Sequence, residues 1–220
     1  MTDRDEMPAA PATAREKLGV LKTLGRRLAL LVFFSLILGL AYPALVTVAG
    51  NAIFPDEASG SLVRTAQGKV AGSRLLGEDW TDTGLFEGRP SATGGNPCNP
   101  MATSGSNYAQ SNPDLAKAVK ERAGRWQKLT GSNAPVPMEL LTASASGLDP
   151  QISLAGALYE IPWVSRSTGI PAADLEALAR SLAKKDLLAF GGDPLVNVLE
   201  LNLKVLEIAK KVPFPKGEAK

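Results

Sequence analysis

The chain has 220 residues, with 24 Lys and Arg against 22 Asp and Glu, a net charge of +2, one cysteine and no histidine. This small charge excess gives no reason to expect a nucleic-acid partner, and the missing histidine excludes Ser-His-Asp and Cys-His catalysis and every His-based metal site. Because Cys98 is the only cysteine, it cannot form an internal disulfide, so we expect a free structural thiol in an accessory or binding protein without a metal site.

The first predicted element is a membrane helix within the uncharged stretch from Leu28 to Pro55. About twenty apolar residues in a helix cross a hydrocarbon core of roughly 30 Å. We predict a cytoplasmic tail over 1–27, disordered through its first 20 residues, and a transmembrane helix over 28–50 with a kink near Pro43. Ser35 and Gly39 form a small-xxx-small pair that predicts packing against another helix. A cleaved signal peptide is the rival interpretation, but its apolar region would be shorter, about 7–15 residues.

Charge on the two sides of this stretch predicts its orientation. Basic residues, including Arg26 and Arg27, precede it, whereas Asp56 and Glu57 follow it. Because positively charged flanks stay in the cytoplasm, we expect a single-pass protein of the cell (inner) membrane with its N-terminus inside. The domain over 51–212 would then be extracytoplasmic, or periplasmic, and a short C-terminal tail would follow over 213–220.

The extracytoplasmic domain is predicted to be α+β. Residues 61–76 alternate short apolar runs with glycines, which indicates two short strands around a turn. Residues 84–113 are rich in Gly, Ser, Asn and Pro. A flexible surface loop accounts for this composition, but an uncharged loop of roughly 30 residues is uncommon in a compact domain and often functional.

Three helices are predicted to follow this loop. The first begins at Asn112-Pro113 and runs to about Thr130. The second is capped by Ser153 and ends at Gly169. The third begins at Pro171 and runs to about Leu188. Residues 196–208 fit a strand and nearly fit a helix, and we expect a strand that bends into a short helix.

Four segments, in this order on this topology, resemble the KdpC family, the C subunit of the Kdp potassium-transporting P-type ATPase. They are GRPSAT (88–93), SNPDL (111–115), TASASGLDPQIS (142–153) and GDPLVNVLELNL (192–203). One departure is Gln151, because the family usually has histidine there. Gln151 keeps hydrogen-bonding capacity but does not titrate, so a pH-dependent role at this position cannot operate.

The resemblance implies a non-catalytic subunit that assembles and stabilises a high-affinity potassium uptake pump. Its implied partners are a catalytic P-type ATPase subunit, a potassium-channel-like pore subunit, a small single-helix subunit and membrane lipid. It implies no cofactor bound directly, because the complex handles ATP and potassium.

The resemblance also implies partner contacts in the polar segments. Turn formation and helix capping are the alternative use of the same side chains, and Arg89 could pair internally with Asp82 or Glu87. The predicted contact residues are Arg89, Pro90, Ser91, Ser106, Asn107, Ser144, Ser146, Asp149, Gln151, Asn197 and Asn202.

Two other functions compete with the pump subunit. A membrane-anchored binding or sensor domain would act alone and would need a defined ligand cavity. An anchored hydrolase would use Ser181 with Lys184 or Lys185, but lysines on a solvated helix end stay protonated.

Overall fold

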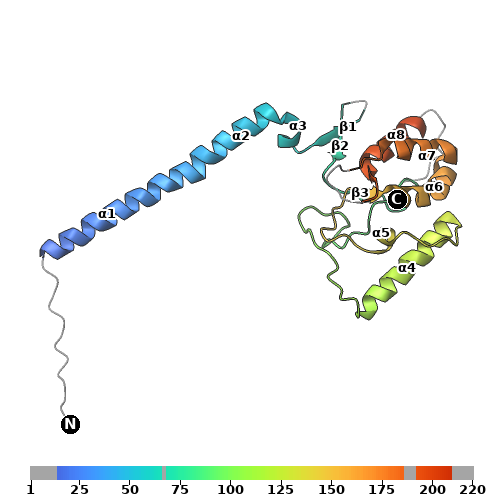
Figure 1. The fold of residues 1–220 in the computed structure, drawn as a ribbon, viewed down its shortest axis with the longest axis horizontal. Coiled ribbons are helices and arrows are strands. Elements are labelled where there is room, and N and C mark those ends of the chain that lie inside the picture. The colour runs from blue at the N-terminus through green and yellow to red at the C-terminus, as the bar shows by residue number, and fades with distance from the viewer. Residues whose placement is uncertain (1–13, 66–67, 186–191, 210–220) are drawn as a thin grey trace, which may run out of the picture. The chain divides into compact units, whose positions relative to one another are not determined.

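The computed structural model describes residues 14–65, 68–185 and 192–209. The chain forms two compact units that meet at Ser59 and Gly60 (Figure 1). The described residues of the first unit form helices, and the second unit combines short strands with helices, so the predicted α+β class with one N-terminal membrane helix is confirmed.

The first unit is built around an apolar helix whose segment Gly19–Ile53 is long enough to cross a membrane. Its residues are exposed along this segment, except for the partly buried Gly50. The helix begins at Ala14, so the expectation of disorder through residue 20 is wrong for 14–20, where helix-forming residues extend the apolar helix backwards. The elements of this unit are α1 (Ala14–Leu36), η1 (Ile37–Ala41), α2 (Tyr42–Ile53) and α3 (Pro55–Ala58).

The distortion expected near Pro43 takes the form of a π-helical turn. The N–H of Tyr42 bonds to the carbonyl of Ile37, five residues back, instead of four. Proline has no N–H to donate, and in a regular α-helix its ring would clash with the carbonyl four residues earlier. The wider π turn, which includes Gly39, accommodates the ring without ending the helix.

The second unit contains two separate two-stranded antiparallel sheets. The β1–β2 hairpin confirms the two strands predicted within 61–76. The other sheet was predicted only in part, because no strand was expected just before the helix capped by Ser153. There Ile152 of β3 pairs with Val196 of β4. The elements of this unit are β1 (Leu62–Arg64), β2 (Val70–Ser73), α4 (Pro113–Thr130), α5 (Met138–Leu141), β3 (Gln151–Ser153), α6 (Leu154–Thr168), α7 (Ala172–Leu182), β4 (Leu195–Asn197) and α8 (Val198–Ala209).

The two central helices begin and end where their capping residues predict. Asn112 accepts a hydrogen bond from the N–H of Asp114 at the start of α4, and Ser153 accepts one from Gly156 at the start of α6. Each helix ends at a glycine in the left-handed region, Gly131 or Gly169. These local signals therefore position the chain on both sides of the segment 131–152, which contains α5 and most of β3.

The C-terminal part differs from expectation at one helix end. Helix α7 stops at Leu182, not near Leu188, because the backbone of Lys184 exchanges two 2.9 Å hydrogen bonds with Leu195 and is extended. Residues 186–188 lie outside the described residues. The strand that bends into a helix is confirmed, although Leu199, Leu201 and Leu203 belong to α8 rather than to a strand face.

The hydrophobic core lies between helices α4 to α8 and the β3–β4 sheet, which are grouped together in Figure 1. It also includes Leu85 and Phe86, the apolar pair in the otherwise polar segment 84–113. The largest fully buried apolar side chains are Phe86, Leu140, Ile152, Val164, Ile170, Leu175, Val196, Leu201 and Val205.

Candidate functional site

The long polar loop is held in one conformation by its own side chains. The hydroxyl of Ser91 accepts a 2.9 Å hydrogen bond from the N–H of Cys98. The hydroxyl of Thr93 donates to the carbonyl of Asn96 at 2.7 Å and accepts from the N–H of Asn99 at 3.2 Å. These side-chain to backbone hydrogen bonds take the place of the backbone hydrogen bonds that a helix or a sheet would supply. The loop therefore has a defined shape, although 84–112 contains neither helix nor strand.

This loop is joined to the segment that precedes β3. The N–H of Ser144 donates to the carbonyl of Pro90, and the N–H of Ser104 donates to Ser146. Gly147, directly after Ser146, has a φ of +70°. A Cβ added to it would stand 2.8 Å from the carbonyl oxygen of Ser104. Only glycine fits this close approach without strain. We call residues 88–108 and 142–151 together the loop platform.

An ion pair fastens the two halves of the loop platform. Nη1 of Arg89 donates to Oδ2 of Asp149 at 3.1 Å, and both side chains are partly exposed. The expectation that Arg89 pairs with Asp82 or Glu87 is wrong, because both acids bind Arg125 of α4, at 2.8 and 2.6 Å. The hydrogen bonds that Arg125 donates to the carboxylate of Glu87 are the main cause of the raised pKa of Arg125.

The predicted contact residues fall into three groups by exposure. Two are buried, so they cannot reach a partner in this conformation: Ser144 and Asn202. Six are partly buried: Arg89, Pro90, Ser91, Ser106, Asp149 and Asn197. Three are exposed: Asn107, Ser146 and Gln151.

Asn202 has a structural role that the sequence does not reveal. Its amide nitrogen donates to the carbonyl of Phe86 at 2.8 Å, and its Oδ1 accepts from the Phe86 N–H at 3.0 Å. Because Phe86 is fully buried in a segment without secondary structure, its backbone would otherwise lack partners. The proposed surface role of Asn202 is therefore replaced by an interior one.

Two further predicted residues also serve the fold. Ser144 accepts from the N–H of Gly147 at 2.8 Å, which closes the turn. Asn197 donates to the carbonyl of Arg74 at 2.9 Å and accepts from the N–H of Glu200 in the first turn of α8. Turn formation and capping thus account for part of the predicted set. Partner contact through the exposed residues stays a prediction.

The structure also shows the surroundings of Ser35 and Gly39 in the apolar helix, and of Ser181 and Lys184, the residues considered for a hydrolase. Ser35 and Gly39 are exposed on the apolar helix, and an added Cβ on Gly39 would meet no atom of the chain within 4 Å. Their packing against another helix stays a prediction. Ser181 donates its hydroxyl to the carbonyl of Leu178 in its own helix, and Lys184 lies exposed beyond the helix end, so this pair does not form a nucleophile and base.

Glu160 on α6 is a buried acid that sequence patterns did not single out. It is fully buried, and its Oε2 accepts a 2.7 Å hydrogen bond from the N–H of Glu87. Burial raises its pKa well above the ordinary value, and the negative charges of Glu87 and Glu139 act in the same direction. Its position among apolar residues of α6 would have been the only signal.

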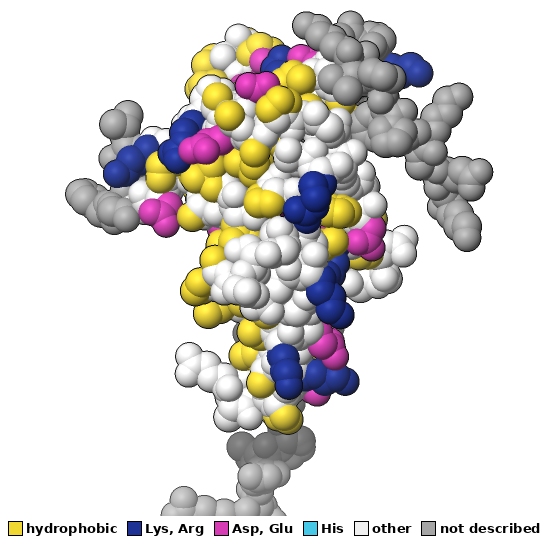
Figure 2. Space-filling view, turned by 90° about the vertical axis from the view of Figure 1, so that its right-hand side faces the viewer, with side chains coloured by type: hydrophobic (Ala, Val, Ile, Leu, Met, Phe, Trp, Pro, Cys, Tyr) yellow, Lys and Arg dark blue, Asp and Glu magenta, His cyan; other side chains and the backbone are white. Residues whose placement is uncertain are grey.

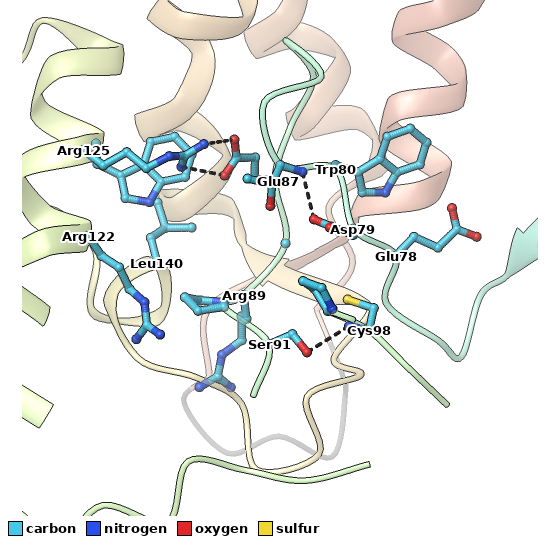
Figure 3. A pocket seen from close by; sticks show the side chains of 15 residues that line it. Glu78, Asp79, Trp80, Glu87, Arg89, Ser91, Cys98, Arg122, Arg125 and Leu140 are labelled. Atoms are coloured by element: carbon cyan, nitrogen blue, oxygen red, sulfur yellow. Dashed lines mark hydrogen bonds and ion pairs between the residues drawn. The ribbon is translucent and has the colours of Figure 1, made fainter. Parts of the chain in front are cut away.

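A cavity of about 250 Å³ opens between α4 and the start of the loop platform (Figure 3). Cys98 lies in its wall with a φ of +54°, and burial raises the pKa of its thiol. The thiol is therefore a weaker nucleophile at neutral pH than an ordinary cysteine. Among the described residues, no group of three His, Cys, Asp or Glu side chains could hold a metal ion.

Comparison with known proteins gives a consistent result. A family model described as "KdpC: K+-transporting ATPase, c chain" matches residues 24–207. The chain is 44% identical over 194 residues to the potassium-transporting ATPase KdpC subunit of Yersinia pseudotuberculosis, covering 88% of this chain and 96% of that protein. It is 44% identical over 184 residues to the subunit of the same name from Pectobacterium atrosepticum, covering 84% and 95%. It is 46% identical over 180 residues to that of Cronobacter sakazakii, covering 80% and 93%.

Proposed function

The chain belongs to the KdpC family of potassium-transporting ATPase subunits, and from this membership we propose that it is a non-catalytic subunit that assembles and stabilises the pump. In this proposal it holds a catalytic P-type ATPase subunit together with a potassium-channel-like pore subunit. The family match over residues 24–207 is the observation that carries the proposal.

The single apolar helix supports a membrane-anchored subunit. We propose that its basic N-terminal flank stays in the cytoplasm and that the α+β domain lies outside the cell (inner) membrane. Ser35 and Gly39 would let a neighbouring helix, from a partner subunit or a small single-helix subunit, approach closely. Membrane lipid would cover the remaining apolar surface.

The loop platform is the proposed docking surface for the pore subunit. Its backbone is held by the hydrogen bonds between Pro90 and Ser144 and between Ser104 and Ser146. A surface that is already ordered loses little conformational entropy when it binds. Asn107, Ser146 and Gln151 are exposed there and offer neutral donors and acceptors.

A non-catalytic role agrees with the chemistry of the chain. It has no histidine, its one thiol has a raised pKa, and Ser181 is committed to its own helix. We therefore propose that the complex, and not this subunit, handles ATP and potassium, and that the subunit binds no cofactor directly.

Co-purification from native membranes tests the docking surface. Gln151→Arg adds a bulky charge at an exposed platform position, and we expect recovery of the partner subunits to fall about tenfold, a loss that corresponds to 1.4 kcal/mol of binding energy. The control Gln127→Arg makes the same change on the exposed face of α4 and should leave recovery unchanged.

Two outcomes would contradict the proposal. Full recovery of both partners with Gln151→Arg would remove this part of the platform from the interface. Recovery of the wild-type chain alone, under conditions that preserve other membrane complexes, would favour a stand-alone anchored binding or sensor domain. Ser35→Leu with Gly39→Leu tests the helix contact in the same assay, and we expect weaker recovery with normal membrane insertion.

A further inference from the structure

The cavity beside the loop platform has two walls of opposite charge. The α4 wall supplies Arg122 and Trp126, and the facing wall includes Glu78 and Asp79 (Figure 3). Its volume of about 250 Å³ is slightly below the roughly 300 Å³ at which pockets for drug-sized ligands begin. The space therefore suits a small molecule.

The cationic wall has donors that the chain does not use. Arg122 donates from Nη1 to the carbonyl of Leu141 at 2.7 Å, and no carboxylate of the described residues forms an ion pair with it. Its neighbour Arg125 differs, because both oxygens of Glu87 bind it. A guanidinium has five N–H donors, so Arg122 retains most of its capacity to bind an oxyanion.

Arg89 adds to this cationic wall. Its Nη1 binds Asp149, but its Nε is buried without a hydrogen-bond partner. In Figure 3 the guanidinium groups of Arg89 and Arg122 extend in the same direction on the same side of the cavity. Two guanidinium groups that line one cavity can bind the two oxygens of a carboxylate.

The acidic wall is also unpaired within the described residues. Neither Glu78 nor Asp79 takes part in an ion pair, and Asp79 accepts a single 3.1 Å hydrogen bond, from the N–H of Thr81 to its Oδ1. Both acids lie close enough to Cys98 to raise the pKa of its thiol. Figure 3 places Asp79 across the cavity from Arg122, whereas the carboxylate of Glu78 points away from the other lining side chains.

The indole N–H of Trp80 resembles the Nε of Arg89, because it is a donor that faces no acceptor in the chain's described residues. The Nε1 of Trp80 is buried without a partner, and Trp80 lines the cavity. Buried donors in folded proteins are nearly always satisfied by protein, water or a bound group. Two such donors line this one cavity, where water or the acceptor of a bound molecule could satisfy them.

We propose that this cavity binds a small zwitterionic molecule, with its carboxylate at Arg122 and Arg89 and its ammonium group at Asp79. Arg122 and Asp79 carry opposite charges on facing walls and form no ion pair within the described residues. They disfavour a purely anionic or purely cationic ligand, because one end would meet like charge. Trp126 and Leu140 also line the cavity and would cover the methylene groups. The inference concerns the isolated subunit and does not depend on how the loop platform docks.

Titration of the full-length chain in detergent with a series of ω-amino acids tests the inference. The probes are β-alanine, γ-aminobutyrate and δ-aminovalerate, and the half-ligands valerate and pentylamine each carry one charge. Trp80 and Trp126 line the cavity, so intrinsic fluorescence reports binding. We expect at least one zwitterion to bind about tenfold more tightly than either half-ligand.

Matched variants separate specific binding from surface adsorption. Arg122→Gln keeps a donor for the Leu141 carbonyl but removes the charge, and Asp79→Asn neutralises the opposite wall. Each should weaken zwitterion binding about tenfold, whereas Lys120→Gln, an exposed change on the same helix, should have no effect. Circular dichroism checks that each variant is folded, and if Arg122→Gln is not, Asp79→Asn decides the test.

Three results would overturn the proposal. The first is that the half-ligands bind as well as every zwitterion. The second is that the dissociation constants of the whole series lie above about 10 mM. The third is that the folded charge-removing variants bind the zwitterions with wild-type affinity.

Discussion

Replacing Glu160 with glutamine should stabilise the domain relative to the wild type, and this difference should grow as the pH rises. Glu160 is fully buried, and its Oε2 accepts the N–H of Glu87, a bond that the glutamine oxygen can also accept. Burial raises its pKa in the folded state, and the charges of Glu87 and Glu139 act in the same direction, while the hydrogen bond from the Glu87 N–H and the nearby Arg125 oppose them. The wild-type chain therefore folds with an extra proton at a pH where the unfolded chain has lost it.

The sign and size of the effect follow from that proton. An acid with a raised folded-state pKa contributes stability below its unfolded pKa of 4.5, and this stability is lost as the pH rises towards the folded pKa. One proton corresponds to about 1.4 kcal/mol per pH unit in that window. Glu160→Gln should thus gain about 1.4 kcal/mol on the wild type for each unit above 4.5, until the folded pKa is reached.

Urea unfolding of the full-length chain at a series of pH values measures this difference. Trp80, Trp126 and Trp163 are the only tryptophans and lie in the second unit, so their fluorescence reports its unfolding. Glu207→Gln, at an exposed acid paired with Lys204, is the control and should show no such slope. A flat difference curve for Glu160→Gln, or one that falls with pH, would refute the assignment of a buried proton to this residue.

Other substitutions test the contacts that shape the domain. Asn202→Ala should reduce the free energy of unfolding by about 2–5 kcal/mol, because it strands two buried backbone groups of Phe86; a loss below about 1 kcal/mol in urea unfolding would contradict this. Asn112→Ala should cost about 1 kcal/mol by uncapping α4, and Asn112→Ser should restore most of it in the same assay. Gly147→Ala should cost at least about 1 kcal/mol, since its φ is +70° and its Cβ would crowd the Ser104 carbonyl; a wild-type thermal melt would show that this turn tolerates a side chain.

Much of this molecule follows from signals that act over a few residues. The uncharged run after Arg27 determines the membrane helix, because its length and composition suit a bilayer. Asn112, Ser153 and Gly169 mark helix ends, since a cap satisfies backbone groups within one turn of itself. The family resemblance likewise came from short segments in a fixed order, and the match over residues 24–207 confirmed it.

The tertiary structure decided which distant polar groups meet. The sequence left Arg89 with two candidate partners, and the fold paired it with Asp149, 60 residues away. Asn202 was expected at the surface, yet it binds Phe86 across 116 residues, and Glu160 gave no local signal of its buried contact with Glu87. Such pairings depend on how helices and loops pack around a common core. A helix cap or an apolar run is complete in its own segment, whereas a buried polar contact exists only once the packing brings both partners together.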